Sequence, residues 1–273
     1  MTRRKPQIMG ILNVTPDSFY DRSRCFETDK AIEHGIRMFQ EGADLIDIGG
    51  ESTRPGAPPV SEEEEMARVI PVIKALKKQI PIPISIDTQK PRIAETAIQE
   101  GASILNDVSG FHDPKMIEVA AKRSVKICVM HMKGSPRTMQ EDPHYEEGIL
   151  NHLLLWMEER AKTLIEAGVQ EKNIIFDPGI GFGKTVEHNL EILHNLQKFK
   201  AMGFPILLGL SRKSFMGKIV NKPSQDLLPT TIAMNTVALM ANVDIIRIHD
   251  VAEHRHVVDV LERYFDVNKV QQV

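Results

Sequence analysis

The sequence predicts an α/β protein folded as a (β/α)8 TIM barrel, with a single domain spanning residues 1–273. Short apolar runs of strand length recur along the chain, and helical patterns separate them. The runs are rich in Ile, Leu and Val without clean alternation, which is typical of strands buried on both faces. Eight strands that each precede a helix indicate a barrel, and a doubly wound open sheet is the alternative.

The elements can be placed in order along the chain. We expect strands at residues 8–14, 44–50, 82–87, 103–109, 126–132, 173–179, 205–211 and 244–250. Ser61 and Glu64 form a capping box before a helix that Pro71 should bend or interrupt. Gly168 and Gly203 stand where helices should end, and Asp250 should cap a last helix over about 251–265.

Composition excludes several classes of function. Of the 273 residues, 42% are apolar and 26% charged, with a net charge of −3, so nothing favours a nucleic acid or an anionic membrane as partner. No apolar stretch approaches the ~20 residues that a transmembrane helix needs. The two cysteines, Cys25 and Cys128, are far apart in sequence, which favours a reducing, cytoplasmic environment.

One motif resembles a nucleotide-binding loop but does not fit it. A P-loop has the pattern G-x-x-x-x-G-K-[ST], and the run "DPGIGFGKT" at 177–185 has Pro178 where the first glycine belongs. Gly179 comes one position too late, and a proline supplies no backbone N–H to a phosphate. The flanking strand and helix patterns keep the question open at this point.

Polar residues follow the carboxyl ends of the predicted strands. They are Asn13, Asp47, Asp87, Asn106, Asp107, Met130 with His131, Asp177, the run 211–213, Arg247 and His249. A single Asp or Asn in such a place is explained equally well as a turn or helix cap. In a closed barrel the whole set would converge on one mouth, where barrel enzymes have their active sites.

This predicted ring has an acidic and a basic part. Carboxylates and amides can accept hydrogen bonds from a flat heterocycle that carries several N–H donors. The cations suit a phosphate or a diphosphate. They are Arg54, Arg212, Lys213, Arg247 and His249.

The motifs at the strand ends resemble those of dihydropteroate synthases. They are "GILNVTPDSF" (10–19), "DIGGESTRPGA" (47–57), "SIDTQKP" (85–91), "ILND" (104–107), "MHMKGSPRTMQ" (130–140), "DPGIGFGK" (177–184), "SRKSF" (211–215) and "RIHD" (247–250). They occur in order from about residue 8 to the last helix. By this resemblance "DPGIGFGKT" is the sixth strand and loop of a barrel rather than a nucleotide cradle.

The resemblance implies a transferase of folate biosynthesis. It would join 4-aminobenzoate to 6-hydroxymethyl-7,8-dihydropterin diphosphate, releasing pyrophosphate through a cation-like pterin methylene. It also implies Mg²⁺ as cofactor, two small-molecule substrates, a homodimer formed through late helices, and mobile first and second lids.

The resemblance also implies roles for individual residues. Catalysis is assigned to Asp87, Lys213, Arg54 and Asp21. The pterin is assigned to Asp87, Asn106, Asp177, Lys213, Arg247 and Met130. Pyrophosphate is assigned to Asn13, Arg54, Arg247 and His249, with Asn13 also holding the metal. The 4-aminobenzoate is assigned to Phe19, Thr53, Pro55, Phe182, Ser211 and Lys213.

Other residues have a plainer interpretation. We expect Lys184 to be a solvated loop residue, His131 a packed barrel residue, and Asp250 a helix cap. We expect the acidic run 62–65 to be a solvated first helical turn. Arg22 and Ser23 depart from the family, which usually has glycines there.

Two other functions compete with the synthase. A related pterin-barrel methyltransferase acting on methyl-tetrahydrofolate would lack the benzoate lid and the lysine, and both are present. A non-catalytic pterin-binding paralogue is disfavoured by the intact Asn13, Arg54 and Lys213.

Overall fold

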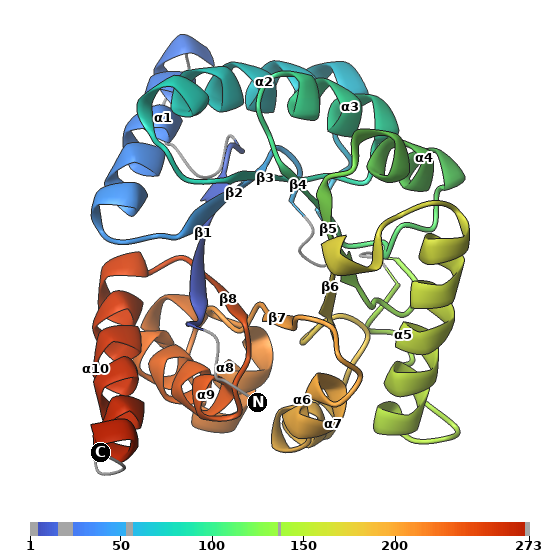
Figure 1. Cartoon of the computed structure of the whole chain (residues 1–273), viewed down its shortest axis with the longest axis vertical. Helices are drawn as coiled ribbons and strands as arrows, with labels where there is room; N and C mark the ends of the chain where they lie inside the picture. Colours follow the sequence, from blue (N-terminus) through green and yellow to red (C-terminus); the bar gives the residue numbers. More distant parts are fainter. Residues whose placement is uncertain (1–4, 16–23, 53–56, 136–137, 271–273) are drawn as a thin grey trace.

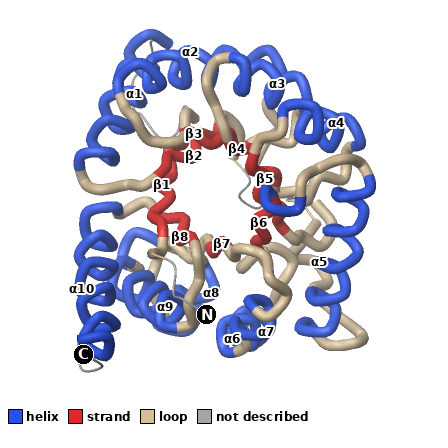
Figure 2. The backbone as a smooth tube through the Cα atoms, viewed as in Figure 1, coloured by secondary structure: helices blue, strands red, loops and turns tan. Residues whose placement is uncertain are grey.

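The described part of the chain folds into a closed parallel barrel. The computed structural model describes residues 5–15, 24–52, 57–135 and 138–270. Its strands form one eight-stranded sheet in the order β6-β5-β4-β3-β2-β1-β8-β7. A parallel bridge between Phe176 and Ile206 joins the two ends of this sheet, so the strands form a ring inside the helices (Figure 2). The predicted barrel is confirmed, and the open doubly wound sheet is wrong.

Seven strands lie within the predicted ranges, and β1 begins one residue before its predicted start at residue 8. They are β1 (Gln7–Asn13), β2 (Leu45–Gly49), β3 (Ile84–Asp87), β4 (Ile104–Asp107), β5 (Lys126–Met130), β6 (Ile174–Asp177), β7 (Leu207–Leu208) and β8 (Ile245–Ile248). Strand β7 is shorter than predicted. Pro205 before it has no N–H for a ladder, and its carbonyl instead accepts the Phe176 N–H at 3.0 Å, where the barrel closes.

The helices surround the strands (Figure 1). They are α1 (Arg24–Gln40), α2 (Glu62–Gln79), α3 (Pro91–Gln99), α4 (Pro114–Arg123), α5 (Ile149–Glu166), α6 (Val186–His194), α7 (Leu196–Lys200), α8 (Ser214–Val220), α9 (Leu228–Met240) and α10 (Val251–Val270). Short 3-10 turns, η2 (Glu171–Asn173) and η3 (Ser224–Asp226), precede β6 and α9.

Two helix starts show how local sequence fixes these bounds. The hydroxyl of Ser61 accepts the Glu64 N–H at 3.2 Å and begins α2, which then continues through Pro71 without a break. The hydroxyl of Thr185 accepts the His188 N–H, and the His188 ring accepts the Thr185 N–H, so a full capping box begins α6. The second half of the "DPGIGFGKT" motif is therefore a helix cap.

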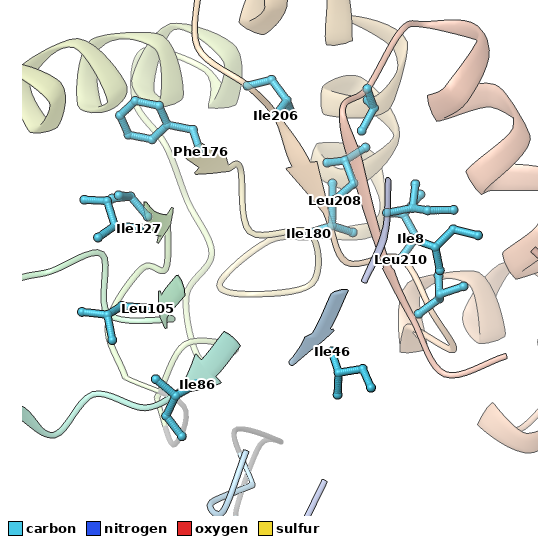
Figure 3. Close-up of a cluster of buried hydrophobic side chains, with 14 of the residues drawn as sticks. Ile8, Ile46, Ile86, Leu105, Ile127, Phe176, Ile180, Ile206, Leu208 and Leu210 are labelled. Carbon is cyan, nitrogen blue, oxygen red and sulfur yellow. The ribbon is translucent and has the colours of Figure 1, made fainter. Parts of the chain in front are cut away.

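The core has an outer and an inner layer. The outer layer lies between the strands and the helices, and Figure 3 shows side chains from β3, β4, β5 and β6 in it, namely Ile86, Leu105, Ile127 and Phe176. The inner layer fills the barrel with Met9, Leu45, Ile104, Cys128, Ile175, Leu207 and Ile245. This apolar layer, called the floor below, closes the inside of the barrel beneath any site at the carboxyl ends of the strands. Among the described helices, none is long and apolar enough to span a membrane.

Candidate active site

The polar ring stands directly above the apolar floor because strand side chains alternate between two faces. Four polar residues each follow a floor residue by two positions: Asp47 after Leu45, Asn106 after Ile104, Asp177 after Ile175, and Arg247 after Ile245. The residue between each pair faces outward toward the helices, as Ile46, Leu105, Phe176 and Ile246 do. The predicted convergence of these strand ends on one mouth is therefore confirmed.

One side of the mouth is an ion-paired network centred on Arg247. Its Nε donates to Asp47 Oδ2 at 2.6 Å, and its Nη2 donates to Asp87 Oδ2 at 2.8 Å. The amide of Asn106 donates to the same Asp47 oxygen at 2.9 Å. Asp47 is fully buried and orients both Arg247 and Asn106, so it is a structural member of the site for which we had predicted no specific role.

Burial makes this acidic side titratable near neutral pH. It raises the pKa of Asp87 to about 7; the Arg247 guanidinium opposes this shift, and the Asp47 carboxylate adds to it. Burial also tends to lower the pKa of Arg247, but Asp47 and Asp87 together raise that pKa above its usual value. The guanidinium therefore stays charged, and a further positive charge in the mouth would favour ionised Asp87.

Asp177 presents a second, separate acceptor. Its Oδ1 accepts the Gly179 N–H at 2.7 Å, and its backbone carbonyl accepts the His131 N–H at 3.0 Å. Its other oxygen, Oδ2, faces Gly209, and a Cβ added to that glycine would lie 4.0 Å from this oxygen. Burial raises the pKa of Asp177, while the Gly179 N–H and the Lys213 ammonium oppose that shift.

Lys213 marks the basic side of the mouth. Its Nζ lies 4.0 Å from the centroid of the Phe182 ring, a cation–π arrangement. Burial lowers the pKa of Lys213 to about 8, and the Asp177 carboxylate opposes this shift. Phe182 packs in a small apolar cluster with Val108, Met130 and Met139. Met130, predicted to contact the pterin, and Phe182, predicted to contact 4-aminobenzoate, therefore belong to the same cluster.

The segment that carries Lys213 is held to the end of β8. The Ser211 hydroxyl accepts the His249 N–H at 3.2 Å and lies 2.9 Å from His249 Nδ1. Arg212 adopts a left-handed φ of 57° and pairs with Asp250 through two bonds of 3.1 and 2.5 Å. The carboxylate of Asp250 therefore ties the two neighbouring loops together, and its predicted role as a helix cap stays a prediction.

Asn13 lies beside Asp87 at the mouth. An added Cβ on Gly49 would be 3.8 Å from Asn13 Oδ1 and 3.7 Å from Asp87 Oδ2, so the two oxygens flank this glycine. Five predicted site residues lie outside the described residues, and their roles stay predictions: Phe19, Asp21, Thr53, Arg54 and Pro55. Arg22 and Ser23, where the sequence departs from the family, lie there too.

The structure corrects two sequence interpretations. Lys184 is 3% exposed rather than solvated, because the loop after β6 turns back over the end of β5 and takes its ammonium group inside. Glu65 is 1% exposed rather than solvated, because it pairs with Lys90, which also bonds Glu51 at 2.7 Å. His131 is packed, as predicted. A helix-start pattern gives no sign that one member of an acidic run turns toward a lysine after β3.

The strands form a closed parallel barrel, and acids and bases with shifted pKa values meet at the carboxyl ends of its strands. This combination is typical of a (β/α)8-barrel enzyme. Comparison with known proteins gives the particular family. The sequence profile described as "Pterin binding enzyme" matches residues 9–249. The dihydropteroate synthase of Clostridium beijerinckii is 48% identical over 249 residues, covering 90% of each chain.

Two solved structures of Xanthomonas albilineans dihydropteroate synthase share the fold. One, with 4-aminobenzoic acid, has a TM-score of 0.89 and 36% identity, covering 95% of this chain and 93% of that one. The other, with 7,8-dihydropteroate, has a TM-score of 0.87 and 34% identity, covering 97% and 95%. The chain belongs to the pterin-binding enzyme family, in the group of the dihydropteroate synthases.

Proposed function

We propose that the mouth of this barrel joins 4-aminobenzoate to 6-hydroxymethyl-7,8-dihydropterin diphosphate, forming 7,8-dihydropteroate and pyrophosphate. The observation that supports this most is the division of the mouth into two parts. Asp47, Asp87 and Asn106 surround Arg247 on one side, whereas Lys213 lies over Phe182 on the other. Such an enzyme is a transferase of folate biosynthesis.

The pterin ring fits the acceptors of the rim. A dihydropterin is flat and carries an amino group and ring N–H donors along one edge, and a buried carboxylate accepts such donors in pairs. Asp177 is the acceptor we assign to the aminopyrimidine edge, with Asn106 and Asp87 as further polar contacts. Met130 supplies apolar wall, and Arg247 flanks the ring.

The diphosphate requires positive charge and fits Mg²⁺. We assign it to Asn13, Arg54, Arg247 and His249. Mg²⁺ is typically held by one or two protein oxygens together with phosphates and water. Asn13 Oδ1, beside Gly49, can supply such an oxygen, and no group of three His, Cys, Asp or Glu in the described chain forms a metal cage. When bound, Mg²⁺ would stabilise the charge on the departing pyrophosphate.

The chain's own residues then support a dissociative substitution. The C–O bond breaks first, and its electron pair leaves with the pyrophosphate, which Arg247 and Arg54 stabilise. Positive charge remains on the pterin methylene, and the ionised Asp87 carboxylate stabilises it. The neutral amine of 4-aminobenzoate attacks the methylene carbon and afterwards loses a proton to solvent, so no strong general base is needed.

The second substrate fits the basic side. Phe182 offers an aromatic face, Lys213 a cation, and Ser211 a hydroxyl next to His249. A benzoate has an apolar ring and a carboxylate, so these groups complement both parts. We assign Thr53, Pro55 and Phe19 to the remaining walls and Asp21 to ordering the closed site.

We also propose a cytoplasmic homodimer. Exposed apolar side chains of α6 and α9, namely Leu190, Val237 and Met240, form a face beside a shallow groove that Leu193 and Met234 help to line. A second copy of the chain would bury this face. Light scattering should give twice the chain mass, and Val237→Asp should give the monomer; a monomeric wild type would contradict the dimer.

The cytoplasmic location is supported by a cysteine. Cys128 is a buried free thiol, which suits a reducing compartment.

The activity is tested by mixing the protein with the pterin diphosphate, 4-aminobenzoate and Mg²⁺. We expect pyrophosphate and 7,8-dihydropteroate in equal amounts, and no pyrophosphate when 4-aminobenzoate is left out beyond slow hydrolysis. Folded protein, checked by circular dichroism, that releases no pyrophosphate would contradict the proposal. Chelation of the metal should slow the reaction, and an unchanged rate would remove Mg²⁺ from it.

A further inference from the structure

A buried lysine, Lys184, lies near the basic side of the mouth, and the reaction described above does not use it. Lys184 is the last residue of the loop that follows β6, just before the Thr185 cap of α6. Burial lowers its pKa to about 7, and the Asp177 carboxylate opposes that shift. A lysine is rarely buried without a partner, so its contacts need an explanation.

The ammonium group of Lys184 connects the loop to the end of β5. Its Nζ donates to the Phe182 carbonyl at 2.9 Å. It also lies 3.0 Å from His131 Nδ1 and 3.4 Å from the His131 carbonyl. Both the charged and the neutral amine carry N–H donors, so the bond to the Phe182 carbonyl is available in either protonation state.

His131 is a fixed anchor for this contact. Its Nε2 lies 3.1 Å from His152 Nε2, and its ring meets the Trp156 ring edge-on with centroids 5.0 Å apart. Its side chain is buried, and its backbone N–H donates to the Asp177 carbonyl. Lys184 therefore connects the glycine-rich loop 179–183 to the His131 side chain, which is packed on several sides.

The loop itself follows the end of β5 closely. Gly179 has a φ of +71°, and a Cβ there would come within 1.8 Å of the His131 carbonyl oxygen, so only glycine fits. Further along the loop, the Gly181 N–H donates to Asn189 Oδ1 at 2.7 Å, and the Tyr145 hydroxyl donates to the Gly183 carbonyl at 2.8 Å. Phe182 lies between these two held residues, and Lys184 bonds its carbonyl.

We propose that Lys184 is a positioning residue that holds Phe182 beneath Lys213 and so shapes the 4-aminobenzoate subsite. This inference rests on the proposed function. Lys184 acts through Phe182, whose backbone it bonds and whose ring lies under the Lys213 ammonium. The pterin acceptor Asp177 keeps its direct bonds from the Gly179 N–H and the His131 N–H when Lys184 is changed, so the 4-aminobenzoate subsite should respond more strongly than the pterin subsite.

The test compares the KM values of both substrates in Lys184→Met, which keeps the apolar stem and loses the N–H donors. Losing one hydrogen bond that positions a ring should raise the KM for 4-aminobenzoate about fivefold. The KM for the pterin diphosphate should stay within about twofold of wild type. Should Lys184→Met fail to fold, Lys184→Gln carries the same test, because its amide reaches less far toward the Phe182 carbonyl.

Lys133→Met is the matched control. Lys133 belongs to the adjacent loop, where it donates to the His144 carbonyl and lies 5.1 Å from the Tyr145 ring, without a bond to Phe182. Removing this charge should leave both KM values within about twofold of wild type. An equal rise of both KM values in Lys184→Met, no rise at all, or the same selective rise in Lys133→Met would overturn the inference. A wild type without activity would instead contradict the proposed function.

Discussion

The two sides of the barrel mouth hold buried charge in opposite ways. On the Arg247 side, two carboxylates share one guanidinium, with contacts of 2.6 Å to Asp47 and 2.8 Å to Asp87. On the Lys213 side, two lysines, the half-buried Lys213 and the buried Lys184, share one carboxylate, Asp177. The first side has an excess of acid and the second an excess of base.

This difference indicates what each side can bind. Burial raises the pKa of Asp87 to about 7 and lowers that of Lys213 to about 8, so both groups are poised to gain charge when a complementary ligand arrives. N–H donors or a developing cation would complete the acidic side, and a carboxylate would complete the basic side. A pterin methylene cation and a 4-aminobenzoate supply those charges.

The largest effect should come from removing the shared guanidinium. Arg247→Met leaves Asp47 and Asp87 buried without their cation, which should lower the free energy of unfolding by about 3 kcal/mol. The loss should be smaller at pH 5 than at pH 8, because a raised carboxyl pKa favours the folded state below it and this advantage fades as pH rises through it. Urea unfolding at both pH values measures this, and an equal loss at both would contradict the charge argument.

Removing the cation on the other side should affect activity more than stability. Lys213→Ala should lower kcat/KM about 100-fold, as expected when a group that stabilises bound charge is lost. It should also weaken pterin binding. The folded state should survive, because Asp177 keeps its bond from the Gly179 N–H and can take up a proton. Unchanged turnover in the folded variant would show that the site lies elsewhere.

The two sides together predict the pH dependence of the reaction. Asp87 must be ionised and Lys213 protonated, so kcat/KM should be bell-shaped, rising through about pH 7 and falling above about pH 8. Each outer limb should change about tenfold per pH unit. Steady-state rates with the pterin diphosphate, corrected for ionisation of its phosphates, give the profile. Asp87→Asn should remove the acidic limb, and its persistence would assign that limb to another group.

A small effect should follow from loosening the outer support of Lys213. Asp250→Asn weakens the pair with Arg212, which is partly exposed to solvent, so we expect a loss of about 0.5 kcal/mol in stability. The KM for 4-aminobenzoate should rise by about twofold, the equivalent of that energy. Thermal unfolding and initial rates measure both, and a tenfold rise would mean that this pair contributes far more than its exposure suggests.

Much of this arrangement follows from local sequence rules. Apolar runs without alternation predicted the strands, and the period of two places Asp47, Asn106, Asp177 and Arg247 on one face once the barrel closes. The positions of Lys184 and Glu65 could not be predicted, because each is buried by a partner distant in sequence, His131 and Lys90. Local patterns describe a loop and a helix start there, and only the tertiary fold adds the partner.

The central claim is that the pterin lies across the carboxylates of the mouth, from Asp87 to Asp177, and that the benzoate lies beside Phe182 and Lys213. A crystal structure of this protein with 7,8-dihydropteroate tests it most directly. The account predicts the aminopyrimidine edge on Asp177 and Asn106, and the benzoate ring against Phe182 with its carboxylate toward Lys213 or Ser211. A product bound in the reverse direction, or away from Asp177 and Lys213, would contradict it.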